Sequence, residues 1–340
     1  MSYGRDGLPL ELPDDWDITV IRKPPMPVLP DPASGVREAL ASPIGSPSLA
    51  EAARGCRKAC ILICDVTRPV PNGLFLRPVI ETLHACGVPG DGVTVLVATG
   101  LHRPNEGEEL PRLVGDPWVL SHARVENHFA RDTAAHARLG ATRAGIPVSI
   151  DRRFVEADLR LVTGLVEPHF MAGWSGGRKL ITPGVAHRDT ITAFHAWRLI
   201  GHPSSANCVL DGNPVHAAQM EIAAMVGRVL SLNTVLDEER RLSFVAFGDV
   251  ADAHEAAVAF MTRYATVEVP RRFPVVATTS AGHPLDATYY QTVKGMVGAA
   301  GILEPGGHML IASSCSEGLG SAEFRAAQER LVAAGPARFL

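Results

Sequence analysis

The chain has 340 residues, of which 46% are hydrophobic and 20% are charged, and its formal net charge is −4. A chain of this length can bury a sizeable core and typically forms about two domains. The weak negative charge excludes a broad basic surface that would attract nucleic acid or anionic lipid, so we expect a small-molecule partner, with no nucleic acid and no membrane.

The amino-terminal segment MSYGRDGLPLELPDDWD is acidic and has neither the basic nor the apolar region of a signal peptide. The sequence also lacks an uninterrupted apolar run of about 18 residues, so we expect a cytoplasmic protein. Its six cysteines are too scattered for a disulfide framework. Cys56, Cys60 and Cys64 are evenly spaced, but KACILICDV is typical of a buried strand, which favours packed thiols over a metal cluster.

Apolar, β-rich runs alternate with helical patterns along the first part of the chain. Residues 58–66 (KACILICDV) predict a strand and residues 74–86 a helix. Residues 93–100 (VTVLVATG) predict a second strand, a helix begins near Asn105, and residues 157–166 (ADLRLVTGLV) predict a third strand. This alternation favours βαβ units and a mostly parallel sheet, in which ligands bind beyond the carboxyl ends of the strands.

A break between two domains is expected near residues 269–273 (VPRRF), after a helical pattern over residues 249–264. We therefore predict an α/β protein with two domains, residues 1–270 and 271–340. Both domains would contain Rossmann-like, mostly parallel sheets with helices on both faces. The elements expected after the break are a strand at 273–280, a helix within 284–303, a strand at 306–315 and a helix at 322–335.

Polar side chains follow the three predicted strands of the first domain. Asp65, Thr67 and Arg68 follow the first strand, His102 the second and His169 the third. Because imidazole titrates near neutral pH, the two histidines are candidates for general acids or bases, although a packed structural role is the alternative. For Asp65 and Arg68 the alternative is a local ion pair.

A glycine turn, Ser175-Gly176-Gly177, is followed by Arg178 and Lys179. Main-chain N–H groups in such a turn can bind an anion, the helix expected after it would present its positive end, and the two basic side chains would add charge. The motif lacks the GK[ST] ending of a Walker A sequence. Phosphate binding and an ordinary surface turn are both compatible with it.

Three further side chains are candidates for ligand binding. His195 lies in a helical pattern beside aromatic residues, where it is either packed or the ligand of a metal whose other ligands come from a cofactor. Gln291 and Lys294 are three residues apart on a predicted helix and could together hold a carboxylate, although a solvated helix face is the alternative. A zinc hydrolase built from His102, His169 and His195 is a second hypothesis.

Five segments, in this order, resemble the nickel-dependent lactate racemase family: DVTRPVP, TGLHRP, EPHFMAGWSGGRKLITPG, LDGNPVH and PLDATYYQTVKG. The resemblance implies an isomerase, a racemase or epimerase of a 2-hydroxy acid such as lactate. It also implies a cofactor, the nickel-pincer nucleotide (pyridinium-3,5-bisthiocarboxylic acid mononucleotide with nickel), which is made by separate maturation enzymes. A hydride would pass to and from this cofactor through a 2-oxo acid.

The resemblance also implies roles for individual residues. Lys179 would tether the cofactor, His195 would bind nickel, and His102 and His169 would be the acid and base. The active site would lie in the cleft between a cofactor-binding domain (1–270) and a substrate-binding domain (271–340) that is truncated relative to the family. A noncatalytic relative is the alternative. The nucleotide would be held by Asp65, Thr67, Arg68, Ser175, Gly176 and Gly177, and the substrate by Arg68, Tyr290, Gln291 and Lys294.

Overall fold

The computed structural model describes residues 1–339, which form two compact units. The sheet unit comprises Lys23–Thr266. The terminal unit combines the two ends of the chain, Met1–Arg22 and Val267–Leu340. The functional division into a cofactor-binding and a substrate-binding domain stays a prediction.

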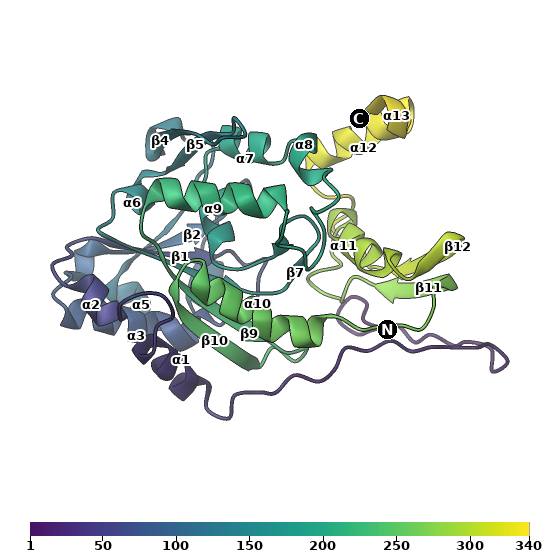
Figure 1. Ribbon diagram of the computed structural model, residues 1–340, viewed down its shortest axis with the longest axis horizontal. Coiled ribbons are helices and arrows are strands. Elements are labelled where there is room, and N and C mark those ends of the chain that lie inside the picture. Colours follow the sequence, from purple (N-terminus) through teal and green to yellow (C-terminus); the bar gives the residue numbers. More distant parts are fainter. Residues whose placement is uncertain (340) are drawn as a thin grey trace. The chain divides into compact units, whose positions relative to one another are not determined.

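The sheet unit is built on six strands in the order β10-β9-β6-β1-β2-β3. Figure 1 labels β10, β9, β1 and β2 of this sheet. Every neighbouring pair is parallel except β9 with β10. The predicted mostly parallel sheet is therefore confirmed. The strands are β1 (Ala59–Cys64), β2 (Val93–Ala98), β3 (Arg124–Asn127), β6 (Leu159–Leu165), β9 (Leu230–Leu236) and β10 (Leu242–Asp249).

Helices cover both faces of this sheet, as predicted. Ile61 and Ile63 of β1 pack into one apolar cluster with α3, while Cys60 and Leu62 pack into another cluster with α9. Alternate residues of a strand point to opposite faces, so a strand buried on both sides must be apolar throughout. The helices of this unit are α1 (Pro32–Ala41), α2 (Leu49–Ala53), α3 (Asn72–Ala85), α4 (Glu109–Val114), α5 (Pro117–His122), α6 (Arg152–Val155), α7 (Arg188–Phe194), α8 (Trp197–Ile200), α9 (Pro214–Val226) and α10 (Asp252–Ala265).

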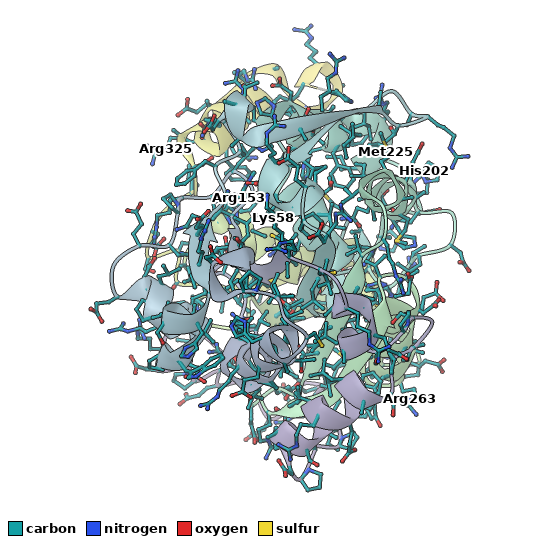
Figure 2. All side chains as sticks on the ribbon, turned by 90° about the vertical axis from the view of Figure 1, so that its left-hand side faces the viewer. Lys58, Arg153, His202, Met225, Arg263 and Arg325 are labelled. Carbon is teal, nitrogen blue, oxygen red and sulfur yellow. The ribbon has the colours of Figure 1, made fainter. Side chains whose placement is uncertain are left out.

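The helix expected from about Asn105 is two short helices. Gly115 ends α4 with φ 76°, a left-handed conformation that glycine adopts without strain, and Pro117 begins α5. Shorter elements complete the unit, and Figure 2 labels Arg153 on α6 and Met225 on α9. They are the antiparallel pairs β4 (His136–Ala141) with β5 (Pro147–Asp151) and β7 (Pro168–His169) with β8 (Gly173–Trp174), the 3-10 turns Gly90–Gly92 and Thr133–Ala135, and a π-helical turn, Leu180–Gly184.

The terminal unit contains one βαβ arrangement. Strands β11 (Phe273–Thr279) and β12 (Leu303–Ala312) are parallel, and α11 (Tyr289–Ala300) connects them. Helices α12 (Ala322–Ala334) and α13 (Pro336–Phe339) follow. The main-chain N–H of Gly4 donates to Asp286 Oδ2 at 2.7 Å, which joins the amino-terminal segment to this unit. The four elements expected after the break are confirmed.

Within residues 1–339, none of the helices combines the length and the apolar character that crossing a bilayer requires.

Candidate active site

Three loops meet at the carboxyl edge of the sheet. Strands β6, β1 and β2 are neighbours and run parallel, so they end on the same side. Asp65 directly follows β1, His102 lies shortly after β2, and Glu167 lies shortly after β6. The prediction that polar groups follow adjoining strand ends is confirmed.

A carboxylate and a histidine pair across two of these loops. Nδ1 of His102 lies 2.7 Å from Oδ2 of Asp65. Thr67 donates to Oδ1 of Asp65 through its main-chain N–H at 3.1 Å and its hydroxyl at 2.5 Å. Burial alone would raise the pKa of Asp65, but the hydrogen bonds from His102 and Thr67 outweigh it and hold that pKa below its usual range. The ionised carboxylate therefore orients the imidazole.

Arg68 reaches the loop after β6. Its Nε lies 3.4 Å from Oε1 of Glu167, and only 20% of its side chain is exposed. One of its terminal nitrogens also donates to the carbonyl of Thr67 at 2.9 Å. The alternative of a local ion pair between Asp65 and Arg68 is therefore wrong, because Thr67 and His102 occupy the carboxylate.

His169 lies on a tight hairpin formed by β7 and β8. Its Nδ1 accepts hydrogen bonds from the main-chain N–H groups of Met171 at 3.3 Å and Ala172 at 3.1 Å. Glu167, which contacts Arg68, lies in the same loop just before His169. The loop after β1 therefore lies between the two loops that carry His102 and His169.

The turn Ser175–Gly177 is held by hydrogen bonds within the protein. Ser175 Oγ donates to the carbonyl of Leu165 at 2.7 Å and accepts from the main-chain N–H of Glu167 at 2.9 Å. The N–H of Gly177 donates to Oδ1 of Asn233 at 2.9 Å. These bonds fix the turn against the end of β6 and the middle of β9.

The segment after this turn is not the regular helix that we expected. Leu180–Gly184 is a single π-helical turn, in which Thr182 is extended (φ −137°, ψ 117°) and Pro183 lacks an N–H donor. The prediction that a helix after this turn presents its positive end to an anion is therefore wrong, because the segment forms only one short, irregular turn. Phosphate binding by Ser175, Gly176 and Gly177 stays a prediction.

Arg178 points inward and is fully buried. Its guanidinium donates to the carbonyls of Ala172 at 3.2 Å and Trp174 at 3.0 Å, to Nδ1 of His216 at 2.9 Å, and contacts Nε2 of His254. Burial lowers the pKa of Arg178 to about 9 and that of His216 to about 4. The expectation that Arg178 adds charge to a surface anion site is therefore wrong. Its side chain instead ties the hairpin loop to α9 and α10.

The start of α9 holds the same loop. Asn213 caps the helix, because its Oδ1 accepts from the N–H groups of Val215 at 2.9 Å and His216 at 3.2 Å. Its Nδ2 donates to the carbonyl of Met171 at 3.0 Å. The LDGNPVH segment thus supports the hairpin that carries His169.

Lys179 and His195 come within electrostatic reach of each other. His195 ends α7, and its Nδ1 lies 2.8 Å from the carbonyl of Ile191. Burial, and to a smaller extent the positive charge of Lys179, lower the pKa of His195. Burial raises the pKa of Cys64 to about 12, while Lys179 acts in the opposite direction on it. The positive charge of Lys179 therefore acts on both the end of β1 and His195.

The predicted substrate residues Tyr290, Gln291 and Lys294 lie on α11 of the terminal unit. The exposed ring of Tyr290 stands edge-on to Phe324, with 5.1 Å between centroids. Oε1 of Gln291 is buried and has no hydrogen-bond partner among the described residues. A buried acceptor of this kind is suited to a donor on a ligand.

In the part of the chain that the structure describes, no three His, Cys, Asp or Glu side chains stand close enough to hold a metal ion together. His102, His169 and His195 therefore do not form the ligand set that a zinc hydrolase needs. That hypothesis is not supported.

Two regions of the chain match known protein families. The lactate racemase N-terminal domain matches residues 3–207, and the lactate racemase C-terminal domain matches residues 270–333. The chain belongs to the lactate racemase family. The predicted resemblance and the prediction of an isomerase of this type are confirmed.

Individual lactate racemases are similar to the chain over most of its length. Lactate racemase from Thermoanaerobacterium thermosaccharolyticum is 32% identical over 326 residues, which cover 95% of this chain and 76% of the relative. Lactate racemase from Lactiplantibacillus plantarum is 32% identical over 289 residues, which cover 85% of this chain and 68% of the relative.

Solved structures show the same fold. The lactate racemase apoprotein from Thermoanaerobacterium thermosaccharolyticum superposes with a TM-score of 0.88 at 30% identity, over 100% of this chain and 82% of that chain. A protein from Thermotoga maritima superposes with a TM-score of 0.63 at 21% identity, over 76% of this chain and 65% of that chain, and this likeness concerns the fold alone.

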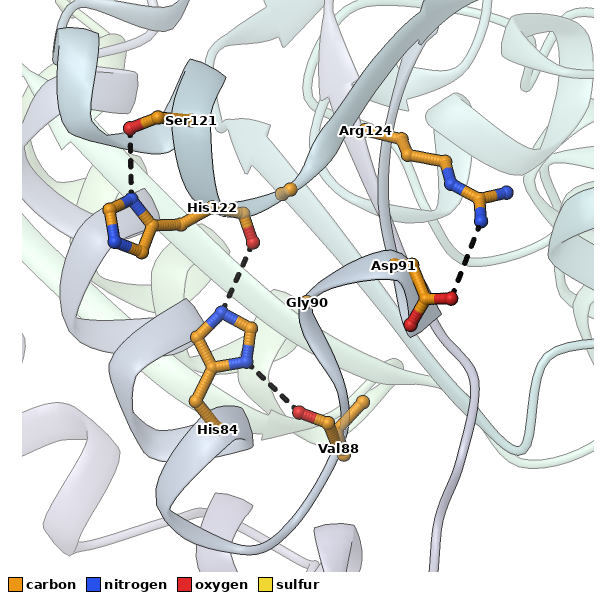
Figure 3. Close-up of a pocket in the computed structure, with 8 residues that line it drawn as sticks. His84, Val88, Gly90, Asp91, Ser121, His122 and Arg124 are labelled. Carbon is orange, nitrogen blue, oxygen red and sulfur yellow. Dashed lines mark hydrogen bonds and ion pairs between the residues drawn. The ribbon is translucent and has the colours of Figure 1, made fainter.

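This lactate racemase family member also has an open hollow of about 650 Å³ at the opposite edge of the sheet, near the starts of β2 and β3 (Figure 3). The histidines that line it form hydrogen bonds within the protein. The ring nitrogens of His84 bond to the carbonyls of Val88 at 3.0 Å and His122 at 3.1 Å, and Nδ1 of His122 bonds to the hydroxyl of Ser121 at 2.9 Å. Ligands of parallel sheets bind at the carboxyl edge, so we do not assign the active site here.

Some residues that build the site of this lactate racemase family member were missed from the sequence. Glu167 lies in the EPHF segment just before His169, and Asn213 and His216 lie in the LDGNPVH segment, where a polar residue before Pro214 is the available signal of a helix start. Asn233 and His254 carry no local signal, because they lie inside a regular strand and a regular helix, away from any turn or motif.

Proposed function

We propose that this protein interconverts the enantiomers of a 2-hydroxy acid of the lactate type. The observation that carries the proposal is the position of His102 and His169, on loops at either side of the loop that follows β1. The hydroxyl groups of two enantiomers face opposite ways at a fixed carbon, so inversion needs a proton-transfer group for each. The names of the two lactate racemase relatives support the same class of substrate.

We propose further that His195 binds the nickel of a nickel-pincer nucleotide. Its Nδ1 is engaged with the carbonyl of Ile191, which leaves the lone pair on Nε2, and burial favours the neutral ring. Histidine ligands of metals commonly donate their other N–H to a main-chain carbonyl in this way. One histidine is sufficient only if the cofactor itself supplies further ligands.

Lys179 is the proposed site of covalent attachment. Its charge acts on both His195 and Cys64, which supports its amine as the attachment point of a cofactor whose nickel His195 would bind. Asp65, Thr67, Arg68 and the Ser175–Gly177 turn are the proposed contacts of the nucleotide.

When bound, this cofactor would supply a reversible acceptor for the hydride on C2 of the substrate, which leaves a 2-oxo acid. The residues of the chain would move the hydroxyl proton and hold the substrate. His102 and His169 would exchange the proton, and Arg68 would place a cation near the substrate carboxylate. From the terminal unit we propose Tyr290, Gln291 and Lys294 as substrate contacts, with Gln291 Oε1 accepting a substrate hydroxyl.

We also propose that the protein works in the cytoplasm and obtains its cofactor from separate maturation enzymes. The scattered cysteines, all of them free thiols, support the location. The family resemblance supports the dependence on maturation enzymes.

The test is to produce the full chain together with the cofactor-making enzymes and to measure its intact mass, its nickel content and its activity on D- and L-lactate. We expect a mass increase the size of the nucleotide, about one nickel per chain, and formation of either enantiomer from the other. Larger 2-hydroxy acids, assayed in parallel, would identify the preferred substrate.

Two variants and a control make this test specific. Lys179→Ala should lose the added mass, and His195→Ala should lose nickel. Lys58→Ala, at an exposed position directly before β1, should keep both (Figure 2). Wild-type protein with neither added mass nor nickel would contradict the cofactor proposal, and a loaded protein that inverts no 2-hydroxy acid would contradict the racemase proposal.

A further inference from the structure

The hydrogen-bond partners of His102 determine where its ring carries a proton. Nδ1 faces Oδ2 of Asp65 at 2.7 Å, and the side chain of Asp65 is 7% exposed while that of His102 is 55% exposed. An ionised carboxylate only accepts hydrogen bonds, so Nδ1 carries a hydrogen. In the neutral ring the lone pair is then on Nε2.

His169 has the opposite surroundings. Its Nδ1 faces two donors, the main-chain N–H groups of Met171 at 3.3 Å and Ala172 at 3.1 Å. A nitrogen that accepts hydrogen bonds cannot carry a hydrogen in the same direction, so the lone pair of the neutral ring is on Nδ1. The hydrogen of His169 is then on Nε2.

We propose that His102 and His169 hold opposite tautomers and that Asp65 is the positioning residue that makes His102 the proton acceptor. This inference deepens the proposed function and rests on it. Asp65 acts here through His102, a role distinct from its proposed contact with the nucleotide.

Transfer of the substrate hydroxyl proton requires only the substrate, His102 and Asp65. The O–H bond of the substrate hydroxyl breaks, its electron pair stays on oxygen, and a new N–H bond forms at Nε2 of His102. The resulting imidazolium lies against the carboxylate of Asp65, which compensates its charge. In the same state, Nε2–H of His169 is a hydrogen-bond donor.

His169 can take the acceptor role only after a local change. To accept a proton at Nε2, the neutral ring must carry its hydrogen on Nδ1, and that nitrogen must leave the N–H groups of Met171 and Ala172. The hairpin between β7 and β8 therefore has to release His169 during inversion of the other enantiomer, whereas His102 needs no such release.

The experiment is a long-range ¹H–¹⁵N correlation spectrum of the full chain with ¹⁵N-labelled histidine rings at about pH 8, where ordinary imidazoles, with a pKa of about 6.5, are neutral. His102→Gln and His169→Gln spectra assign the two signals by their disappearance. We expect the pattern of a ring protonated at Nδ1 for His102 and at Nε2 for His169. The reverse pattern for either ring would overturn its assignment.

Asp65→Asn tests the role of the carboxylate. Thr67 donates two hydrogen bonds to Oδ1, so the single amide oxygen should stay with Thr67 and the amide nitrogen should face His102. We expect the tautomer of His102 to invert and kcat of the loaded enzyme to fall on the order of 10²-fold or more, with little change in KM. Asp189→Asn, which alters a carboxylate 3.5 Å from His187, is the matched control and should leave the His102 signal unchanged.

The outcomes separate this inference from the proposed function. Tautomers are read without cofactor or substrate, so an inactive protein with the expected spectrum would contradict the racemase proposal alone. An unchanged His102 tautomer in Asp65→Asn would overturn the positioning role. If cofactor content also fell in that case, Asp65 would act only as a nucleotide contact.

Discussion

At the scale of single residues, Arg178 is the side chain on which the hairpin of the site most depends. Arg178→Met would remove the guanidinium that donates to the buried carbonyl of Trp174 and to Nδ1 of the partly exposed His216. The carbonyl of Ala172 would keep only the main-chain N–H of Trp174. We expect the free energy of unfolding to fall by about 3 kcal/mol or more, measured by urea denaturation. Arg143→Met, whose side chain is 92% exposed, is the control. Equal destabilisation by the two changes would contradict this role.

The same cluster predicts a dependence of stability on pH. Burial, followed by the charge of Arg178, lowers the pKa of His216 to about 4, whereas an unfolded histidine titrates near about 6.5. As the pH falls between these values the unfolded chain binds a proton that the folded chain does not, so the free energy of unfolding falls. The full contribution is present above about pH 6.5.

The slope from His216 should be below the limit of about 1.4 kcal/mol per pH unit, because the ring is partly exposed. His216→Asn keeps an acceptor near the position of Nδ1 but does not titrate. Urea denaturation from pH 7 to about pH 4 should therefore show a shallower loss of stability in the variant. Parallel curves for the two proteins would show that His216 does not contribute.

At the scale of elements, the site depends on the close approach of β6 to the turn before Lys179. A Cβ at Gly164 would lie 2.4 Å from the main-chain nitrogen of Gly177 and 2.9 Å from Cα of Gly176, and both neighbours are backbone. Gly164→Ala should therefore displace the turn and lower the free energy of unfolding by about 2 kcal/mol.

Gly298→Ala is the control for this change, because nothing lies within 4 Å of a Cβ at this position of α11. It should stabilise the protein by up to about 1 kcal/mol, since alanine favours a helix over glycine. Thermal denaturation of both variants and of wild type measures these differences in stability. A Gly164→Ala protein as stable as wild type would mean that β6 and the turn can separate without cost.

At the scale of the whole molecule, the sheet unit has its own apolar core. The four clusters of buried apolar side chains found among residues 1–339 all lie within Lys23–Thr266. We expect a fragment of residues 23–266 to fold alone and to unfold in one cooperative transition, followed by circular dichroism. A fragment without a cooperative transition would show that its core requires the rest of the chain.

Much of the fold could be predicted because its elements have local patterns. The apolar run around Ile61 predicts a strand buried on both faces, and polar residues directly after such runs predict the carboxyl edge where Asp65 and His102 lie. The helix expected after Lys179 failed for a reason also present in the sequence, since Pro183 interrupts it. Packing against β6 then fixes the turn that replaces it.

The sequence by itself determined the α/β class, the mostly parallel sheet, the positions of both histidines after strands, and membership of the lactate racemase family. Only the tertiary structure decided which groups are partners. His102 meets Asp65 from 37 positions away, and Arg178 meets His254 from 76 positions away. Hydrogen bonds act over about 3 Å in space, so the tautomers and the inward direction of Arg178 depend on neighbours that only folding brings together.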